Sequence, residues 1–147
     1  MKPDEAEAVS ALVLSSFDEF IAPQYEEQGV IEFRRYSQPD AIRHRIESDH
    51  FVMVAETHGA LVGMIEIRDC NHVGLLFVVK TYQHRGVARA LLDQALVEAR
   101  GTRPDLARVT VNSSTYGVAA YEKLGFIQTG PERTVNGIVF IPMARRL

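Results

Sequence analysis

Near the start of the chain, apolar residues recur at the three- and four-residue intervals that are typical of a helix. They are Ala8, Leu12, Phe17 and Phe20. Asp4 precedes this run and Glu7 follows three residues later, which is the pattern of a capping box. The pattern predicts an amphipathic helix from about residue 4 to residue 20, ended by Pro23.

The next stretch, residues 24–38, mixes aromatic and charged side chains without a clear period. It indicates a loop that includes a short helix at most. Pro39 and Asp40 then supply a helix start, because proline is tolerated in the first helical turn and an acidic residue there suits the helix dipole. A second helix is therefore predicted at 39–47.

Strand-forming residues dominate the middle of the chain. Residues 51–55 and 61–67 are rich in valine, isoleucine and methionine, and the pair 58–59 between them is His-Gly, a tight-turn pair. Together they predict a β-hairpin. A turn at 69–71 leads into a third predicted strand at 72–79.

The remaining pattern alternates helices with strands. From Gln83 the apolar period becomes helical, and a wide apolar stripe is formed by Ala88, Leu91, Leu92, Ala95, Leu96 and Ala99. Gly101 is the predicted C-cap of this helix. The later elements are a strand at 108–112, a helix at 116–124 capped by Gly125, a strand after Phe126 and, past the Asn-Gly turn 136–137, a strand at 138–143.

This order predicts an α/β fold in which helices cover both faces of a mixed, mostly antiparallel twisted sheet. The chain of 147 residues is 46% hydrophobic and 24% charged, which is the composition of an ordinary globular protein. One domain, residues 1–147, is expected.

Charge and cysteine usage exclude several classes of protein. A net charge of −3 argues against a protein that binds nucleic acid. Cys70 is the only cysteine, so no intramolecular disulfide forms, and the five histidines lack metal-ligand spacing. The start of the chain is acidic rather than apolar, and no apolar run approaches the ~20 residues that cross a bilayer. We expect a cytoplasmic protein with no metal and no membrane contact.

Between residues 75 and 89 an apolar strand runs into a tight loop that opens directly into a helix. At the opening the residues are small or basic: His84, Arg85, Gly86, Ala88 and Arg89. The first N–H groups of a helix lack internal partners and carry partial positive charge, so this segment is suited to a phosphate or pyrophosphate. A plain strand–turn–helix explains the same residues equally well.

Residues 83–88, Gln-His-Arg-Gly-Val-Ala, resemble the Q/R-x-x-G-x-G/A motif of the GNAT superfamily of acyl-CoA-dependent N-acyltransferases. Residues 111–126, which end in Tyr-Glu-Lys-Leu-Gly-Phe, resemble the second signature of that family, Y-x-K-L-G-F. Both motifs occur in the family's order, at a fitting separation and on the predicted elements. The resemblance covers roughly residues 51–143, whereas the first fifty residues match only in their helical pattern.

The resemblance implies how acetyl-CoA would be held. Backbone N–H groups of the loop and helix start would hold the pyrophosphate: His84, Arg85, Gly86, Val87, Ala88 and Arg89. The end of the preceding strand, Leu76, Phe77 and Val78, would pair with the pantetheine arm, and a bulge there would splay the next strand away. Asn112 or Ser114 would hydrogen-bond the pantetheine amides.

The resemblance also implies the chemistry. Tyr121 occupies the position of the family's general acid, and a phenol suits protonation of a leaving thiolate. The N–H of Val78 would polarise the thioester carbonyl. His72 stands where some members carry a glutamate base, although a solvent-facing histidine at a strand end explains it as well. Glu66 is a second candidate base.

The expected reaction is direct acetyl transfer to a primary amine of a small molecule or peptide. A non-catalytic acyl-CoA-binding sensor or interaction domain stays open as the alternative. Acidic and aromatic residues of the first helix and loop are expected to line the acceptor pocket: Asp18, Tyr25, Glu26, Glu32 and Tyr36. The family's first strand is short or missing here, which leaves a sheet edge that a second copy would cover in a homodimer.

Overall fold

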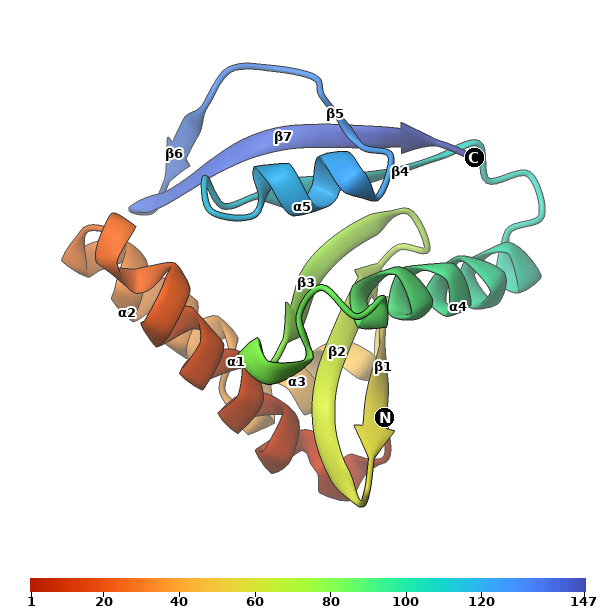
Figure 1. Ribbon diagram of the computed structural model, residues 1–147, viewed down its shortest axis with the longest axis horizontal. Coiled ribbons are helices and arrows are strands. Elements are labelled where there is room, and N and C mark those ends of the chain that lie inside the picture. The colour runs from red at the N-terminus through yellow and green to blue at the C-terminus, as the bar shows by residue number, and fades with distance from the viewer.

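The computed structural model describes residues 1–147, apart from the side chain of Pro3. Three helices precede the first strand and two more lie between later strands (Figure 1): α1 (Ala6–Phe20), α2 (Glu27–Tyr36), α3 (Pro39–Ile46), α4 (Val87–Thr102) and α5 (Val118–Lys123). The strands are β1 (His50–Thr57), β2 (Ala60–Arg68), β3 (His72–Val78), β4 (Arg108–Ser113), β5 (Ile127–Gln128), β6 (Arg133–Val135) and β7 (Ile138–Arg146). Short 3-10 turns are η1 (Pro3–Glu5), η2 (Ala22–Gln24) and η3 (Lys80–Tyr82).

The strands form one sheet in the order β1-β2-β3-β4-β7-β5, with β6 paired to β7. Only the β3–β4 pair is parallel, and every other pair is antiparallel. The sheet therefore consists of a first half, β1 to β3, and a second half, β4 to β7, joined along β3 and β4 (Figure 1). This confirms the predicted mixed, mostly antiparallel sheet.

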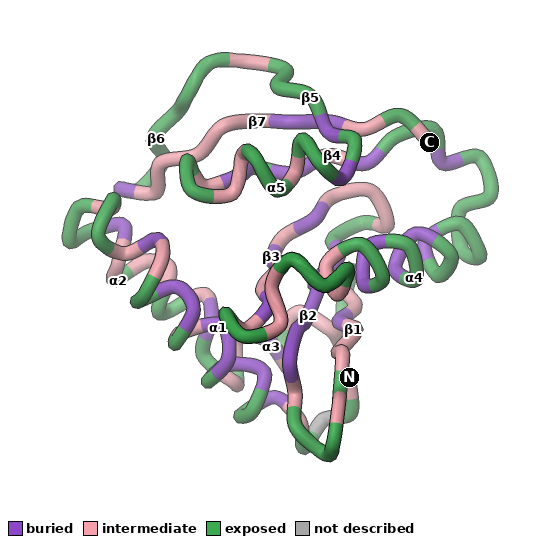
Figure 2. Tube along the Cα trace, viewed as in Figure 1, coloured by how far each residue is buried: buried purple, intermediate pink, exposed green. Residues whose placement is uncertain are grey.

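Alternation along β2 sends neighbouring side chains to opposite faces of the first half. Ile65 and Ile67 pack with α4, whereas Met64 packs with α1 and α3 on the other face. All three are at most 1% exposed. Figure 2 shows the matching buried stripes on α1 and α4. Because each fully buried aliphatic side chain contributes about 1.5–3 kcal/mol, these two layers hold the helices on the sheet.

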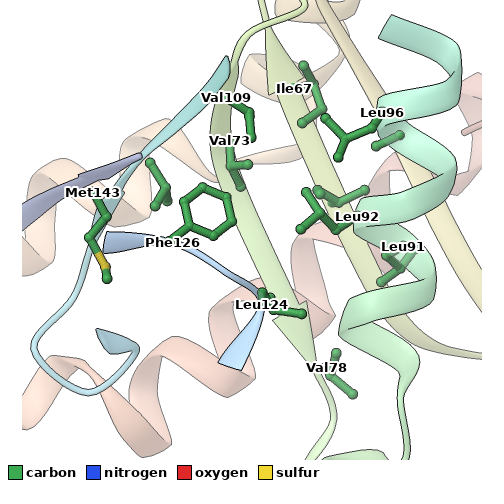
Figure 3. Close-up of a cluster of buried hydrophobic side chains, with 13 residues drawn as sticks. Ile67, Val73, Val78, Leu91, Leu92, Leu96, Val109, Leu124, Phe126 and Met143 are labelled. Atoms are coloured by element: carbon green, nitrogen blue, oxygen red, sulfur yellow. The ribbon is translucent and has the colours of Figure 1, made fainter. Parts of the chain in front are cut away.

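The cluster under α4 continues into the second half of the sheet. Figure 3 shows Leu92 and Leu96 of α4 facing Ile67, while the ring of Phe126 lies near Val73. Phe126 follows α5, and it is 1% exposed. One continuous apolar cluster thus joins the two halves where few backbone hydrogen bonds connect them.

Two predicted caps are wrong. The residue before α1 is Glu5, in a helical conformation and without a capping side-chain hydrogen bond. Its carboxylate instead accepts from the N–H of Lys2 at 2.6 Å, because η1 already turns the chain there. Gly101 lies inside α4, which continues to Thr102 and ends at Arg103. The guanidinium of Arg103 donates to the carbonyl of Asp69 at 3.0 Å, which holds this later end.

Residues 27–36, expected to be mostly loop, form the full helix α2. Its aromatic residues Phe33 and Tyr36 pack toward the first half of the sheet, and Phe33 stacks on Phe17 of α1 with 4.0 Å between the ring centroids. Tertiary packing of this kind stabilises a helix that local propensity alone leaves marginal. The second predicted helix is confirmed as α3.

Among the described residues, no strand precedes α1, as predicted, so β1 forms one edge of the sheet. The ammonium group of Met1 donates to the carbonyl of Val52 in β1 at 2.7 Å. Of the helices that the structure describes, none is long and apolar enough to span a bilayer.

Candidate active site

The sheet opens between its two halves. β3 and β4 pair only at His72 with Thr110 and Val73 with Val111. Directly after these pairs, Gly74 is unpaired opposite β2, where the register shifts by one residue. Such a bulge bends the strand and increases its twist. β3 and β4 therefore diverge, and the space between them is a cleft of about 520 Å³.

Beyond Val73, the edge of β3 that faces the cleft has no strand partner among the described residues. Residues 74–78 of β3 line the cleft, and they include the predicted Leu76, Phe77 and Val78. An unpaired strand edge presents backbone N–H and C=O groups that an extended ligand can pair with. The splaying predicted from the sequence is present, with its bulge at Gly74 rather than at the strand end.

The loop after β3 turns into α4 through two left-handed residues, His84 (φ 62°) and Gly86 (φ 83°). Gly86 is the residue before α4, and no side chain caps the first turn. The N–H groups of Val87, Ala88 and Arg89 are therefore open donors at the positive end of a 16-residue helix. A Cβ at Gly86 would meet no other atom within 4 Å, so the approach to these donors is free.

Two basic residues of this segment have defined partners. Arg89 reaches across the cleft and donates to the carbonyl of Lys123, at the end of α5, at 2.7 Å. Arg85 lies 5.2 Å from the ring centroid of Tyr82, in cation–π range. Arg89 therefore ties the end of α5 to the first turn of α4 across the cleft.

Tyr121 lies on α5 and lines the cleft between the loop and α1. Its ring packs edge-on against Phe126 with centroids 5.4 Å apart. Burial raises the pKa of the phenol well above its ordinary value of 10.0. Among the hydrogen bonds of the described residues, none involves its hydroxyl group. The structure thus holds a protonated phenol in the cleft with its hydroxyl available to a ligand.

The β4–α5 corner is closely packed around Gly117. A Cβ there would come within 2.9 Å of the Ser113 hydroxyl and 3.2 Å of the Ser114 hydroxyl. The Ser114 hydroxyl also accepts a hydrogen bond from the Gly117 N–H at 3.0 Å. Asn112 is exposed and lines the cleft with Ser114. Of the two predicted amide-binding residues, Asn112 therefore has the freer side chain.

Neither candidate base lies in the cleft. His72 starts β3, where its Nδ1 is 2.7 Å from the hydroxyl of Thr110, and it does not line the cleft. Burial, helped by the charge of Arg68, lowers the pKa of His72 from 6.5 to about 4. His72 was a candidate because of its position relative to Gly86, but at His72 β3 is still paired to β4 and the two strands have not yet diverged.

Glu66 is fully buried under the guanidinium of Arg45, on the face of β2 that packs with α1 and α3. Arg45 binds both carboxylate oxygens, at 2.7 and 2.9 Å, and its guanidinium carbon lies 3.6 Å from the ring centroid of Tyr36. Glu66 does not line the cleft either. This carboxylate holds α3 on the sheet and has no access to a reacting group.

The end of the cleft away from the α4 loop is aromatic rather than acidic. It is lined by Phe20, Tyr25, Phe33, Phe77 and Tyr116. Of the predicted acceptor residues only Tyr25 is among them. From the sequence, Phe20 was assigned to helix packing, and Phe33 and Tyr116 were not among the predicted acceptor residues. The concentration of aromatic residues between positions 17 and 36 was the signal that could have indicated an aromatic chamber.

Backbone and side-chain contacts join the helices beside this end to the second half of the sheet. Gly29 of α2 lies so near the β6–β7 turn that a Cβ on it would be 2.1 Å from the carbonyl oxygen of Gly137. Gln24 and Thr115 are hydrogen-bonded through their side chains, and the rings of Phe20 and Tyr116 stack at 5.0 Å. The segment from α1 to α2 is thereby fastened to the second half of the sheet (Figure 1).

These features form one continuous site. The free N–H groups at the start of α4 can bind an anionic group. The unpaired edge of β3 extends from there along the cleft, and the phenol of Tyr121 lies next to the aromatic chamber. The arrangement fits a long ligand with a phosphorylated head, an extended amide-bearing arm and a reactive end.

Comparison with known proteins gives the same picture. The family model described as "Acetyltransferase (GNAT) domain" matches residues 21–147. A GCN5-related N-acetyltransferase from Rhodopseudomonas palustris is 22% identical with a TM-score of 0.83, covering 100% of this chain and 92% of that one. The PaiA N-acetyltransferase from Thermoplasma acidophilum, solved with coenzyme A, is 16% identical with a TM-score of 0.79, covering 100% and 96%.

An aminoglycoside 6'-N-acetyltransferase, also complexed with coenzyme A, is 15% identical with a TM-score of 0.69, covering 99% of this chain and 92% of that one. At these identities the structures share the fold, and the family match rests on the sequence model.

Proposed function

The chain belongs to the GNAT acetyltransferase family, and we propose that it transfers the acetyl group of acetyl-CoA to a primary amine by direct attack, with Tyr121 as general acid. The observation that carries this proposal is the continuity of the cleft. It connects the open N–H groups of α4, the unpaired edge of β3 and the phenol of Tyr121.

The residues of the cleft fit CoA. The first turn of α4 offers backbone donors to a pyrophosphate, and left-handed Gly86 lets the phosphates approach closely. Of the predicted Leu76, Phe77 and Val78, Phe77 turns its backbone groups toward Met64 of β2. The unpaired edge therefore offers the N–H and C=O of Leu76 and the N–H of Val78 to the pantetheine amides. When bound, acetyl-CoA supplies an activated acyl group and a thiolate leaving group.

The residues of the chain would then act at two atoms of acetyl-CoA, the carbonyl oxygen and the sulfur. The N–H of Val78 polarises the carbonyl oxygen, which gains negative charge as the amine attacks. Tyr121 donates its phenolic proton to the departing sulfur. Burial raises the pKa of Tyr121, which keeps the phenol protonated until the sulfur develops charge beside it.

The amine must reach the site neutral, because a protonated amine has no lone pair. No aspartate or glutamate is among the residues that line the cleft, His72 lies outside it, and His84 lines it only at the phosphate loop. Solvent water at the open end of the cleft therefore takes the proton. The rate should then follow the deprotonation of the acceptor amine itself rather than that of a side chain.

An enzyme is favoured over a non-catalytic sensor because the cleft continues past Tyr121 into the aromatic chamber. A sensor needs room for CoA alone. This chamber, lined by Phe20, Phe33 and Tyr116 among others, gives an acceptor a place beside the phenol.

Two measurements test the proposal. Calorimetry should show that CoA binds the chain and that Gly86→Val weakens this binding about tenfold or more. Chromatographic detection of free CoA, with acetyl-CoA and a panel of primary amines, should show amine-dependent release with a matching N-acetylated product. Absence of CoA binding would overturn the proposal, and so would CoA binding without acetyl transfer to any amine.

A further inference from the structure

The chamber beside Tyr121 has a definite position along the cleft. Arg89 ties the C-terminal end of α5 to the first turn of α4, so that end marks the phosphate side. Tyr116 precedes α5 at its other end and stacks on Phe20 of α1. The chamber is therefore on the side of Tyr121 remote from the phosphates, where the acceptor of the proposed reaction would arrive.

The walls of this chamber are aromatic faces held in fixed orientations. Phe20 and Tyr116 are stacked with 11° between their planes, while Phe33 meets Phe77 at 64°. Tyr116 is nonetheless 47% exposed. Rings locked by their neighbours lose little conformational freedom on binding, and an incoming ring gains both apolar burial and offset stacking.

The chamber has no carboxylate to receive a second positive charge. Of the acidic residues nearest in sequence, Glu26 and Glu27 are exposed and lie outside the lining of the cleft. Three others have partners: Asp18 pairs with Arg34, Glu32 with Arg35, and Glu19 with Lys80. None of these three acids lines the cleft. The basic residues that line it, His84, Arg89 and Lys123, are at the phosphate end.

These observations distinguish between acceptors. A polyamine or aminoglycoside would bring further ammonium groups against aromatic walls, with no counter-charge and at a desolvation cost. An amine carried on one aromatic ring would place the ring between Phe20, Phe33 and Tyr116 and its single nitrogen toward Tyr121.

We propose that the acceptor is a primary amine borne on a single aromatic ring through a short linker, with no second cationic group. This substrate class rests on the acetyl transfer proposed above. Phe20 and Tyr116 are then specificity-determining residues, because their stacked pair forms the wall that the ring would contact.

A panel of four amines tests the class: 2-phenylethylamine, n-butylamine, spermidine and kanamycin, each with saturating acetyl-CoA. The expected kcat/KM for 2-phenylethylamine exceeds that for n-butylamine and for both polycations about tenfold or more, since a fitted apolar pocket discriminates roughly 10–200-fold per group. Faster transfer to spermidine or kanamycin overturns this inference while leaving the acetyltransferase proposal intact. Failure to bind CoA, or to acetylate any of them, overturns both.

Variants test the wall. Tyr116→Ala and Phe20→Leu should each raise the KM for 2-phenylethylamine about tenfold, with the KM for acetyl-CoA unchanged. Phe20→Leu keeps an apolar side chain in α1, so the fold is retained. Ile31 of α2 is 59% exposed, so Ile31→Ala is the matched surface control and should change neither KM.

Binding gives a readout that does not depend on turnover. Calorimetric titration of 2-phenylethylamine into the protein–CoA complex should detect binding, and Tyr116→Ala should weaken it about tenfold. Equal affinity of Tyr116→Ala and the unmodified chain would overturn the assignment of this wall to the acceptor.

Discussion

Replacing Tyr121 by phenylalanine removes one oxygen atom from the cleft and little else. The ring can keep its edge-on contact with Phe126 at 5.4 Å. The hydroxyl has no hydrogen-bond partner among the described residues, so its removal orphans no buried group. We expect the free energy of unfolding to change by less than about 0.5 kcal/mol.

The catalytic effect should be far larger. General acid catalysis contributes about 10²–10⁴-fold. We expect a value in the lower part of that range, because the raised pKa makes Tyr121 a weaker acid than the leaving thiol, whose reference pKa is about 8.5. Proton transfer from the phenol to the sulfur is therefore less favourable. We expect kcat to fall about 10²- to 10³-fold, equivalent to about 2.7–4 kcal/mol in the activation barrier.

The assay is steady-state release of CoA at several acetyl-CoA concentrations, with thermal unfolding measured on the same preparations. The KM for acetyl-CoA should stay within about twofold, because the phosphate and pantetheine contacts lie elsewhere. Tyr82→Phe, the same chemical change at the phosphate end of the cleft, is the control and should keep its kcat. A Tyr121→Phe variant with more than a third of the original kcat would refute the reasoning.

Three further outcomes are expected. Gly86→Ala puts a side chain at φ 83° and should raise the KM for acetyl-CoA about tenfold, a strain of roughly 1–2 kcal/mol at the loop, while Gly101→Ala inside α4 should leave that KM unchanged. Glu66→Gln leaves the charge of Arg45 without its buried partner and should cost about 3–5 kcal/mol in chemical denaturation. For His72 the pKa is lower in the fold, so protonation favours the unfolded chain: stability should fall from pH 6.5 toward about 4, and His72→Gln should flatten that fall in urea titrations at stepped pH.

Local patterns predicted the parts of the fold that local energetics determine. The His-Gly pair at 58–59 and the Asn-Gly pair at 136–137 form the predicted hairpin turns, with the left-handed φ angles that these turns need. The apolar stripe from Leu91 to Ala99 marks the face of α4 that packs on the sheet. The loop before α4 was identified for the same reason: a strand end, a left-handed glycine and a helix start are adjacent in the chain.

What the sequence did not reveal depends on contacts between distant segments. Glu66 was a candidate base because its pairing with Arg45, which comes from α3, is invisible in the strand pattern. His72 was placed by counting from Gly86, and counting does not show where β3 parts from β4. The aromatic chamber brings together α1, α2, β3 and the β4–α5 corner, so no single stretch of sequence describes it.

The contact between Gly29 and Gly137 has a consequence for how acceptor preference can change. At this point main chain touches main chain, and any side chain on Gly29 would overlap a carbonyl oxygen. The spacing between α2 and the β6–β7 turn, beside the chamber, is therefore a backbone distance that substitution of Gly29 can only disrupt. A change of acceptor preference would therefore come from substitutions at the aromatic positions of the chamber, while the contact between Gly29 and Gly137 stays fixed.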